Sequence, residues 1–202
     1  MKIICITVAA LATAALCSGQ MPARARIDVD GNSKGIALTN FIVSKGSARC
    51  ASWMKPEQNA RFVTSDLDIA QNKWTQVFFT FTPLASGEVN IQLKGNYWKK
   101  NSADKNITPV PVYFDAVTVT GGTIVNGDFE ERDDQGELKS WYKGGNEASW
   151  MNVPPLINND PVFVKSGSQS IRVWHNAVYS QNIKVTANTP VTINAWVYQD
   201  VK

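Results

Sequence analysis

Flat aromatic side chains alternate with amide and guanidinium side chains in several segments of this chain. An aromatic ring can stack on the apolar C–H face of a pyranose, while planar polar groups bond the sugar hydroxyls. We interpret three tryptophans as stacking candidates: Trp174, Trp196 and Trp98. The hydrogen-bonding candidates are Arg172, Gln92, Asn194, Gln76 and Tyr198.

Strand alternation is what places these residues on outward faces. Successive side chains of a strand point to opposite sides of its sheet. Residues 191–198 separate an apolar set that begins at Val191 from a polar and aromatic set that contains Trp196. The competing interpretation is that such outward rings are covered by a loop or a second sheet. We interpret Lys94 as a solvated charge and His175 as a structural residue.

Period-2 runs rich in β-branched and aromatic residues recur along the chain, and no long helical pattern is present. Such runs, bounded by Gly, Asn, Asp and Pro, predict strands and an all-β sandwich or barrel. Residues 31–60 match no pattern that can be placed. The predicted strands are 74–83, 88–98, 112–120, 171–175, 178–185 and 190–198.

Several of these motifs resemble a known family. IVNGDFE at 124–130, SGSQSIRVW at 166–174 and TPVTINAWVY at 189–198 are similar to the first half of carbohydrate-binding modules with the galactose-binding-like jelly roll. WTQVFFTFTP at 74–83 and VYFDAVTV at 112–119 are similar to the second half. Because the order is reversed, the resemblance implies a circularly permuted jelly-roll β-sandwich over residues 26–202. The alternative is two modules, 26–121 and 122–202.

The resemblance also implies a structural calcium ion away from the sugar face. The matching ligand positions are Glu130, Asp115, the turn at 165–168 with Ser168, and Asp128. Calcium takes carboxylate and carbonyl oxygens together. Ala116 replaces an Asp or Asn that the family often carries after the closing-strand Asp. The alternative is that Glu130 and Asp115 only hydrogen-bond nearby turns.

The N-terminus is typical of a secretory signal peptide. Lys2 precedes an apolar run that is too short for a membrane span, and Ala23-Arg24-Ala25 resembles a cleavage site. We predict a leader over residues 1–25, with Gly19 as the second choice of cleavage site, and a secreted or periplasmic protein. No second apolar stretch is long enough to span a bilayer. Cleavage leaves Cys50 as the one remaining cysteine, so no intramolecular disulfide is expected.

Charge and motifs exclude other classes of function. Loss of Lys2 and Arg24 lowers the basic residues from 20 to 18 against 17 acidic ones, far from the basic surface that nucleic acid requires. No catalytic signature is present, and we predict a glycan-binding protein that is not an enzyme. The alternatives are a structural or protein-interaction sandwich of the cell envelope and, less favoured, a glycoside hydrolase that uses carboxylates within residues 130–137.

Overall fold

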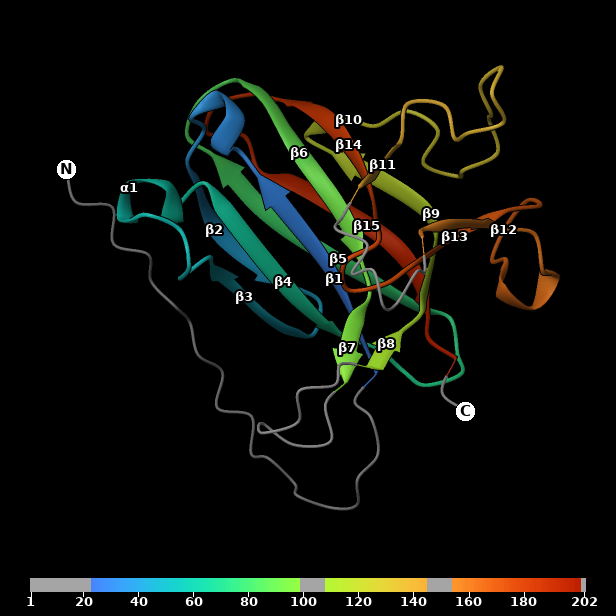
Figure 1. Ribbon diagram of the computed structural model, residues 1–202. Helices are drawn as coiled ribbons and strands as arrows, with labels where there is room; N and C mark the ends of the chain where they lie inside the picture. Colours follow the sequence, from blue (N-terminus) through green and yellow to red (C-terminus); the bar gives the residue numbers. More distant parts are fainter. Residues whose placement is uncertain (1–22, 99–107, 145–153, 201–202) are drawn as a thin grey trace, which may run out of the picture.

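The computed structural model describes residues 23–98, 108–144 and 154–200. Two antiparallel sheets pack face to face around one apolar core, so the protein is an all-β sandwich, as predicted (Figure 1). Within these ranges, no helix has the length and apolar character needed to cross a membrane.

The first sheet has seven strands. Their order is β10 (Gly122–Thr123), β14 (Val178–Val185), β6 (Gly87–Lys94), β1 (Arg24–Asp30), β4 (Phe62–Asp68) and β3 (Gly46–Cys50), and β11 (Tyr142–Gly144) also pairs with β14. Strand β1 therefore lies in the interior of this sheet, between β6 and β4.

The second sheet has six strands. Their order is β12 (Leu156–Asn158), β13 (Ser170–Val173), β9 (Val112–Thr120), β15 (Val191–Tyr198), β5 (Thr75–Pro83) and β2 (Leu38–Val43). A separate two-stranded ribbon is formed by β7 (Asn96–Trp98) and β8 (Thr108–Val110), at the lower end of the sandwich in Figure 1. The helical elements are short: α1 (Pro56–Asn59), η1 (Asn32–Lys34) and η2 (Pro161–Phe163).

All six predicted strands are present, with small shifts at their ends. The run predicted at 88–98 is interrupted at Gly95, where β6 ends and β7 begins. Four strands lie before residue 70, where the sequence patterns predict none: β1, β2, β3 and β4.

Alternation correctly predicts the core faces. The inward residues of β15, such as Val191 and Ile193, are fully buried, and the same holds for Ile91 and Leu93 of β6. Strands that follow residue 122 are hydrogen-bonded to earlier strands in both sheets, because β14 pairs with β6 and β15 lies between β5 and β9. Each sheet therefore contains strands from both parts of the chain.

The start of β1 bears on where a leader could be removed. Ala25 is buried opposite Leu67, and Arg24 contacts Asp68 at 2.9 Å and donates its backbone N–H to Gln199 Oε1 at 2.8 Å. Cleavage after Ala25 would remove these contacts from an interior strand, whereas cleavage after Gly19 would leave β1 whole. For a chain from which a leader has been removed, we therefore expect intact-mass analysis to show a start before Arg24. A mature chain that starts at Arg26 would contradict this prediction.

Cys50 is disulfide-bonded in the structure, whereas the prediction of no intramolecular disulfide concerns the chain after removal of the leader and stays a prediction. The other two cysteines, Cys5 and Cys17, lie outside the described residues and inside the predicted leader.

Candidate functional site

Most of the sequence-predicted sugar-binding residues lie on the six-stranded sheet. Asn194, Trp196 and Tyr198 belong to β15, and Gln76 on β5 lies directly opposite Trp196. Arg172 belongs to β13, and Trp174 follows that strand. All of these except Trp174 alternate with buried aliphatic neighbours and therefore project outward.

The segment around η2 covers the aromatic rings of this face. Phe163 stacks on Tyr113 with ring centres 4.3 Å apart and packs edge-on against Tyr198 at 5.4 Å. The Lys165 ammonium lies 4.2 Å from the centre of the Trp196 ring. Rings that already have such partners do not offer an open stacking platform for a sugar.

Trp174 is also occupied by protein contacts. Its side chain is buried, with 8% of the residue exposed, and its Nε1–H donates to the Pro154 carbonyl at 3.2 Å. The Arg172 guanidinium lies 4.4 Å from the centre of the Trp174 ring. This pair stabilises the end of β13 rather than presenting a free surface.

The remaining two predicted residues do not join this face. Trp98 is the last residue of β7, and its side chain lies outside the described part of the structure. Gln92 lies on β6 in the seven-stranded sheet and projects from the opposite outer surface of the sandwich. The structure therefore separates Gln92 from the tryptophans with which the sequence analysis grouped it.

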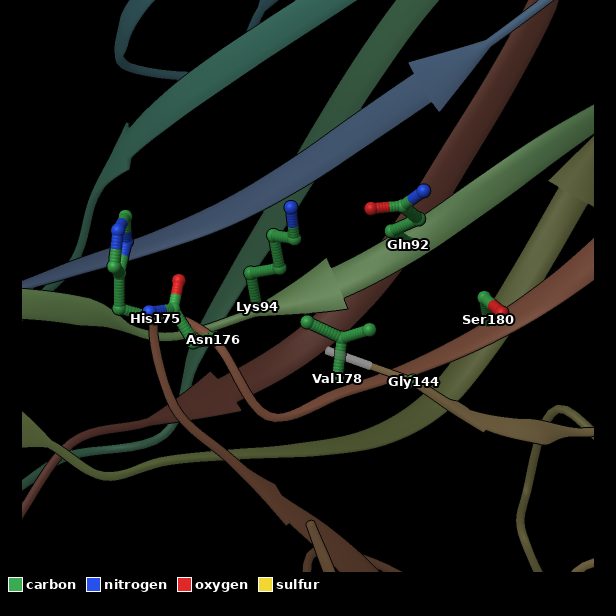
Figure 2. Close-up of a pocket in the computed structure, with 7 residues that line it drawn as sticks. All are labelled: Gln92, Lys94, Gly144, His175, Asn176, Val178 and Ser180. Carbon is green, nitrogen blue, oxygen red and sulfur yellow. The ribbon is translucent and has the colours of Figure 1, made fainter. Parts of the chain in front are cut away.

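Gln92 instead lines a cavity of about 330 Å³ on the outer face of the seven-stranded sheet. Figure 2 shows Gln92 and Lys94 rising from the same side of β6, with His175 and Asn176 at one end of the cavity and Ser180 at the other. Val178 and Gly144 complete the lining.

Gly95 allows the turn that carries His175 to reach this cavity. Its backbone N–H donates to the Trp174 carbonyl at 3.0 Å, and a Cβ at this position would lie 3.0 Å from both the Trp174 Cα and the Val173 carbonyl oxygen. A larger residue would therefore push the turn away from the end of β6. The Trp174 N–H closes the turn by donating to the Ala177 carbonyl at 2.9 Å.

A buried carboxylate lies beside the cavity. Asp28 is directly opposite Gln92 in the sheet, and its side chain is 1% exposed. Lys94 Nζ donates to Asp28 Oδ2 at 3.0 Å, and Arg26 Nη2 contacts both carboxylate oxygens at 3.3 and 3.4 Å. Arg26 Nη2 also donates to Thr64 Oγ1 at 3.2 Å. These bonds fix both cations at the edge of the cavity.

His175 is held in its neutral form by the same groups. Burial lowers its pKa to about 4, and the positive charges of Arg26 and Lys94 act in the same direction against a smaller opposing effect of Asp28. Arg26 Nη1 lies 3.3 Å from His175 Nδ1. Because a guanidinium group can only donate, Nδ1 accepts this bond, and the proton of the neutral ring resides on Nε2.

An exposed aromatic ring lies on the same surface. Tyr142 of β11 is directly opposite Ser180 of β14 and is 64% exposed. Residues directly opposite each other in a sheet project from the same face, so the Tyr142 ring stands on the face that carries the cavity. Tyr142 and Asp28 are not among the predicted site residues, although the alternation of Arg26 and Asp28 with Ile27 and Val29 indicates a strand with one polar face.

Two of the predicted calcium residues, Asp115 and Glu130, bond neighbouring residues of one turn, and N–H groups surround both carboxylates. Asp115 Oδ2 accepts the backbone N–H groups of Lys165 and Ser166 at 2.8 and 3.0 Å. Glu130 Oε1 accepts those of Ser168 and Gln169 at 2.8 and 2.9 Å. Asp128 is exposed.

The pKa values of the two carboxyls differ because their burial differs. Burial raises the pKa of Asp115 despite its hydrogen bonds. Burial also acts to raise the pKa of Glu130, but the bonds from Ser168 and Gln169 outweigh it, so that the pKa is lowered.

Calcium takes six to eight oxygen ligands, which include carboxylate and carbonyl groups. The turn N–H groups satisfy both carboxylates without a cation. Within the described ranges, no three His, Cys, Asp or Glu side chains gather to hold a metal ion. Calcium binding stays a prediction.

A second cavity, of about 500 Å³, is lined by the same turn and by residues around η2. Its lining residues Lys165, Ser166 and Ser168 already donate their backbone N–H groups to Asp115 or Glu130. The cavity beside Gln92 is therefore the stronger candidate.

Comparisons of the chain with protein-family models, curated proteins and solved structures find no match.

Proposed function

We propose that this protein is a secreted, non-catalytic carbohydrate-binding module. Its glycan lies on the outer face of the seven-stranded sheet, at the cavity lined by Gln92 and Ser180. The observation that carries the proposal is the exposed ring of Tyr142 on the same face as this group of amide, hydroxyl and ammonium side chains. Stacking on the ring and hydrogen bonds to the cavity together supply what a pyranose requires.

The fold that we propose for this module is a circularly permuted jelly roll. Supporting it, the strands that contain the opening motifs of the family come late in the chain and still pair with the early strands in both sheets. Residues 23–200 would then form one domain, in place of two modules divided near residue 121.

A structural or protein-interaction sandwich is the second candidate. The observation that favours it is the covering of Tyr113, Tyr198 and Trp196 by Phe163 and Lys165, which removes the aromatic surface expected on the six-stranded sheet. This candidate predicts that the folded protein binds no glycan at either face.

We expect Tyr142→Ala to lower the affinity for the best ligand of a glycan array about ten- to hundredfold, because the stacking surface is lost. Tyr142→Phe keeps the ring and is expected to retain most of the affinity. Trp196→Ala, on the other sheet, is the matched control and should bind as the wild type does. Unchanged binding by a folded Tyr142→Ala protein, or loss of binding in Trp196→Ala alone, would overturn the proposed site.

A further inference from the structure

Two cations share one carboxylate beside the candidate glycan site. Lys94 and Arg26 both bind Asp28, whose side chain is 1% exposed, while their own side chains remain 18% and 12% exposed. Because Lys94 lines the cavity, a ligand there can approach its ammonium group but not the buried carboxylate that holds it.

The two cations and one carboxylate carry an excess of one positive charge, and a neighbouring carboxylate does not cancel this excess. Asp66 Oδ1 lies 3.6 Å from Arg26 Nε, and the same carboxylate also pairs with Arg49. The linked group of Arg26, Asp28, Arg49, Asp66 and Lys94 thus has three positive charges against two negative ones. The positive charge nearest the cavity belongs to Lys94, which is part of the lining.

The other lining groups are uncharged or apolar. Gln92, Asn176 and Ser180 can donate hydrogen bonds, and His175 is neutral near pH 7. Among the described residues, the lining contains no carboxylate. The cavity therefore presents a cation and several donors to its ligand.

We propose that the glycan bound here is acidic, and that Lys94 binds a carboxylate or sulfate group on its sugar units. This inference rests on the proposed carbohydrate-binding function and specifies its ligand class. A charge-assisted hydrogen bond is stronger than a neutral one. Asp28 holds the Lys94 ammonium at the edge of the cavity. The linked group of five charged side chains still has a net positive charge.

The test compares polygalacturonate with the same polymer after chemical reduction of its carboxyl groups, by isothermal titration calorimetry. Dextran sulfate and neutral dextran form the second pair and distinguish sulfate from carboxylate recognition. The wild type is expected to bind at least one acidic polymer about tenfold or more tightly than its neutral counterpart. Lys94→Gln should remove most of this difference. Lys139→Gln, which removes an equal charge from an exposed pair with Glu131, should not.

Each outcome separates the two proposals. Equal binding of acidic and neutral polymers, lost in Tyr142→Ala but unchanged in Lys94→Gln, would overturn the acidic ligand and leave the glycan site standing. Equal losses in Lys94→Gln and Lys139→Gln would show only a general effect of net charge and would also overturn it. Absence of binding to all four polymers and to a glycan array would overturn both proposals.

Discussion

Asp28→Asn is expected to lower the free energy of unfolding by about 3 kcal/mol, because the substitution removes the negative charge between two partly buried cations. Arg26 and Lys94 would remain close together with a neutral amide as their partner. Their partial exposure lets solvent relieve some of the repulsion, which keeps the loss near the lower end for such pairs. Urea denaturation at pH 7 measures it.

Asp68→Asn is the matched control for this prediction. Asp68 lies on the neighbouring strand β4 and pairs with Arg24, but its side chain is 36% exposed and that of Arg24 is 43% exposed. A solvent-exposed pair contributes less than about 1 kcal/mol. Similar losses in the two variants would show that Asp28 does not organise this face.

Stability is expected to fall as the pH is lowered from about 6.5 towards 4, because His175 must stay neutral in the folded protein. Its pKa is lowered from 6.5 to about 4, so in this window the unfolded chain binds a proton that the folded chain excludes. This loss of stability is absent above the pKa of His175 in the unfolded chain and is complete below its pKa in the folded protein. It amounts to at most about 3 kcal/mol, and to less where solvent screens the partly exposed ring.

His175→Gln isolates this contribution. The chain has one histidine, so no second imidazole contributes between pH 5 and 6.5. Carboxyl groups such as Asp115, whose pKa is raised by burial, are present in both proteins and cancel in the comparison. Urea denaturation at pH 7 and pH 5 should show a smaller difference in the variant than in the wild type. An equal difference in both proteins would contradict the buried neutral histidine.

Alternation predicts the face of each strand but not the sheet to which the strand belongs. Gln92 and Trp196 both project outward as expected, yet they lie on opposite surfaces of the sandwich. Sheet membership depends on pairing between segments far apart in the chain, such as β14 with β6. A period-2 pattern within one segment contains no information about such pairing.

Long-range packing also explains why local sequence patterns do not show that the aromatic residues on the outer face of the six-stranded sheet are covered. Phe163 follows a polar, proline-containing loop in the sequence, and nothing local indicates that it stacks on Tyr113 about fifty residues earlier. The interpretation of Trp174 and Trp196 as open platforms assumed that outward means exposed. In this fold, the loop after β12 occupies that surface.

Strand β1 was missed for a different reason. Its first residues, Arg24 and Ala25, resemble the end of a leader, and this resemblance hid the alternation that continues through Ile27 and Val29. The charged residues of the site were therefore not predicted either, because Arg26 and Asp28 belong to this strand. The polar face of β6, with Gln92, was predicted correctly because no competing signal overlaps it.

The proposed glycan site lies on the face that carries Tyr142 and His175. Hydroxyl-radical footprinting with mass spectrometry, with and without the best glycan of an array, tests it directly. We expect the oxidation of Tyr142 and His175 to fall on binding, while that of the exposed Trp53 is unchanged. Protection of Trp196 and Tyr198, with Tyr142 oxidised as before, would contradict it.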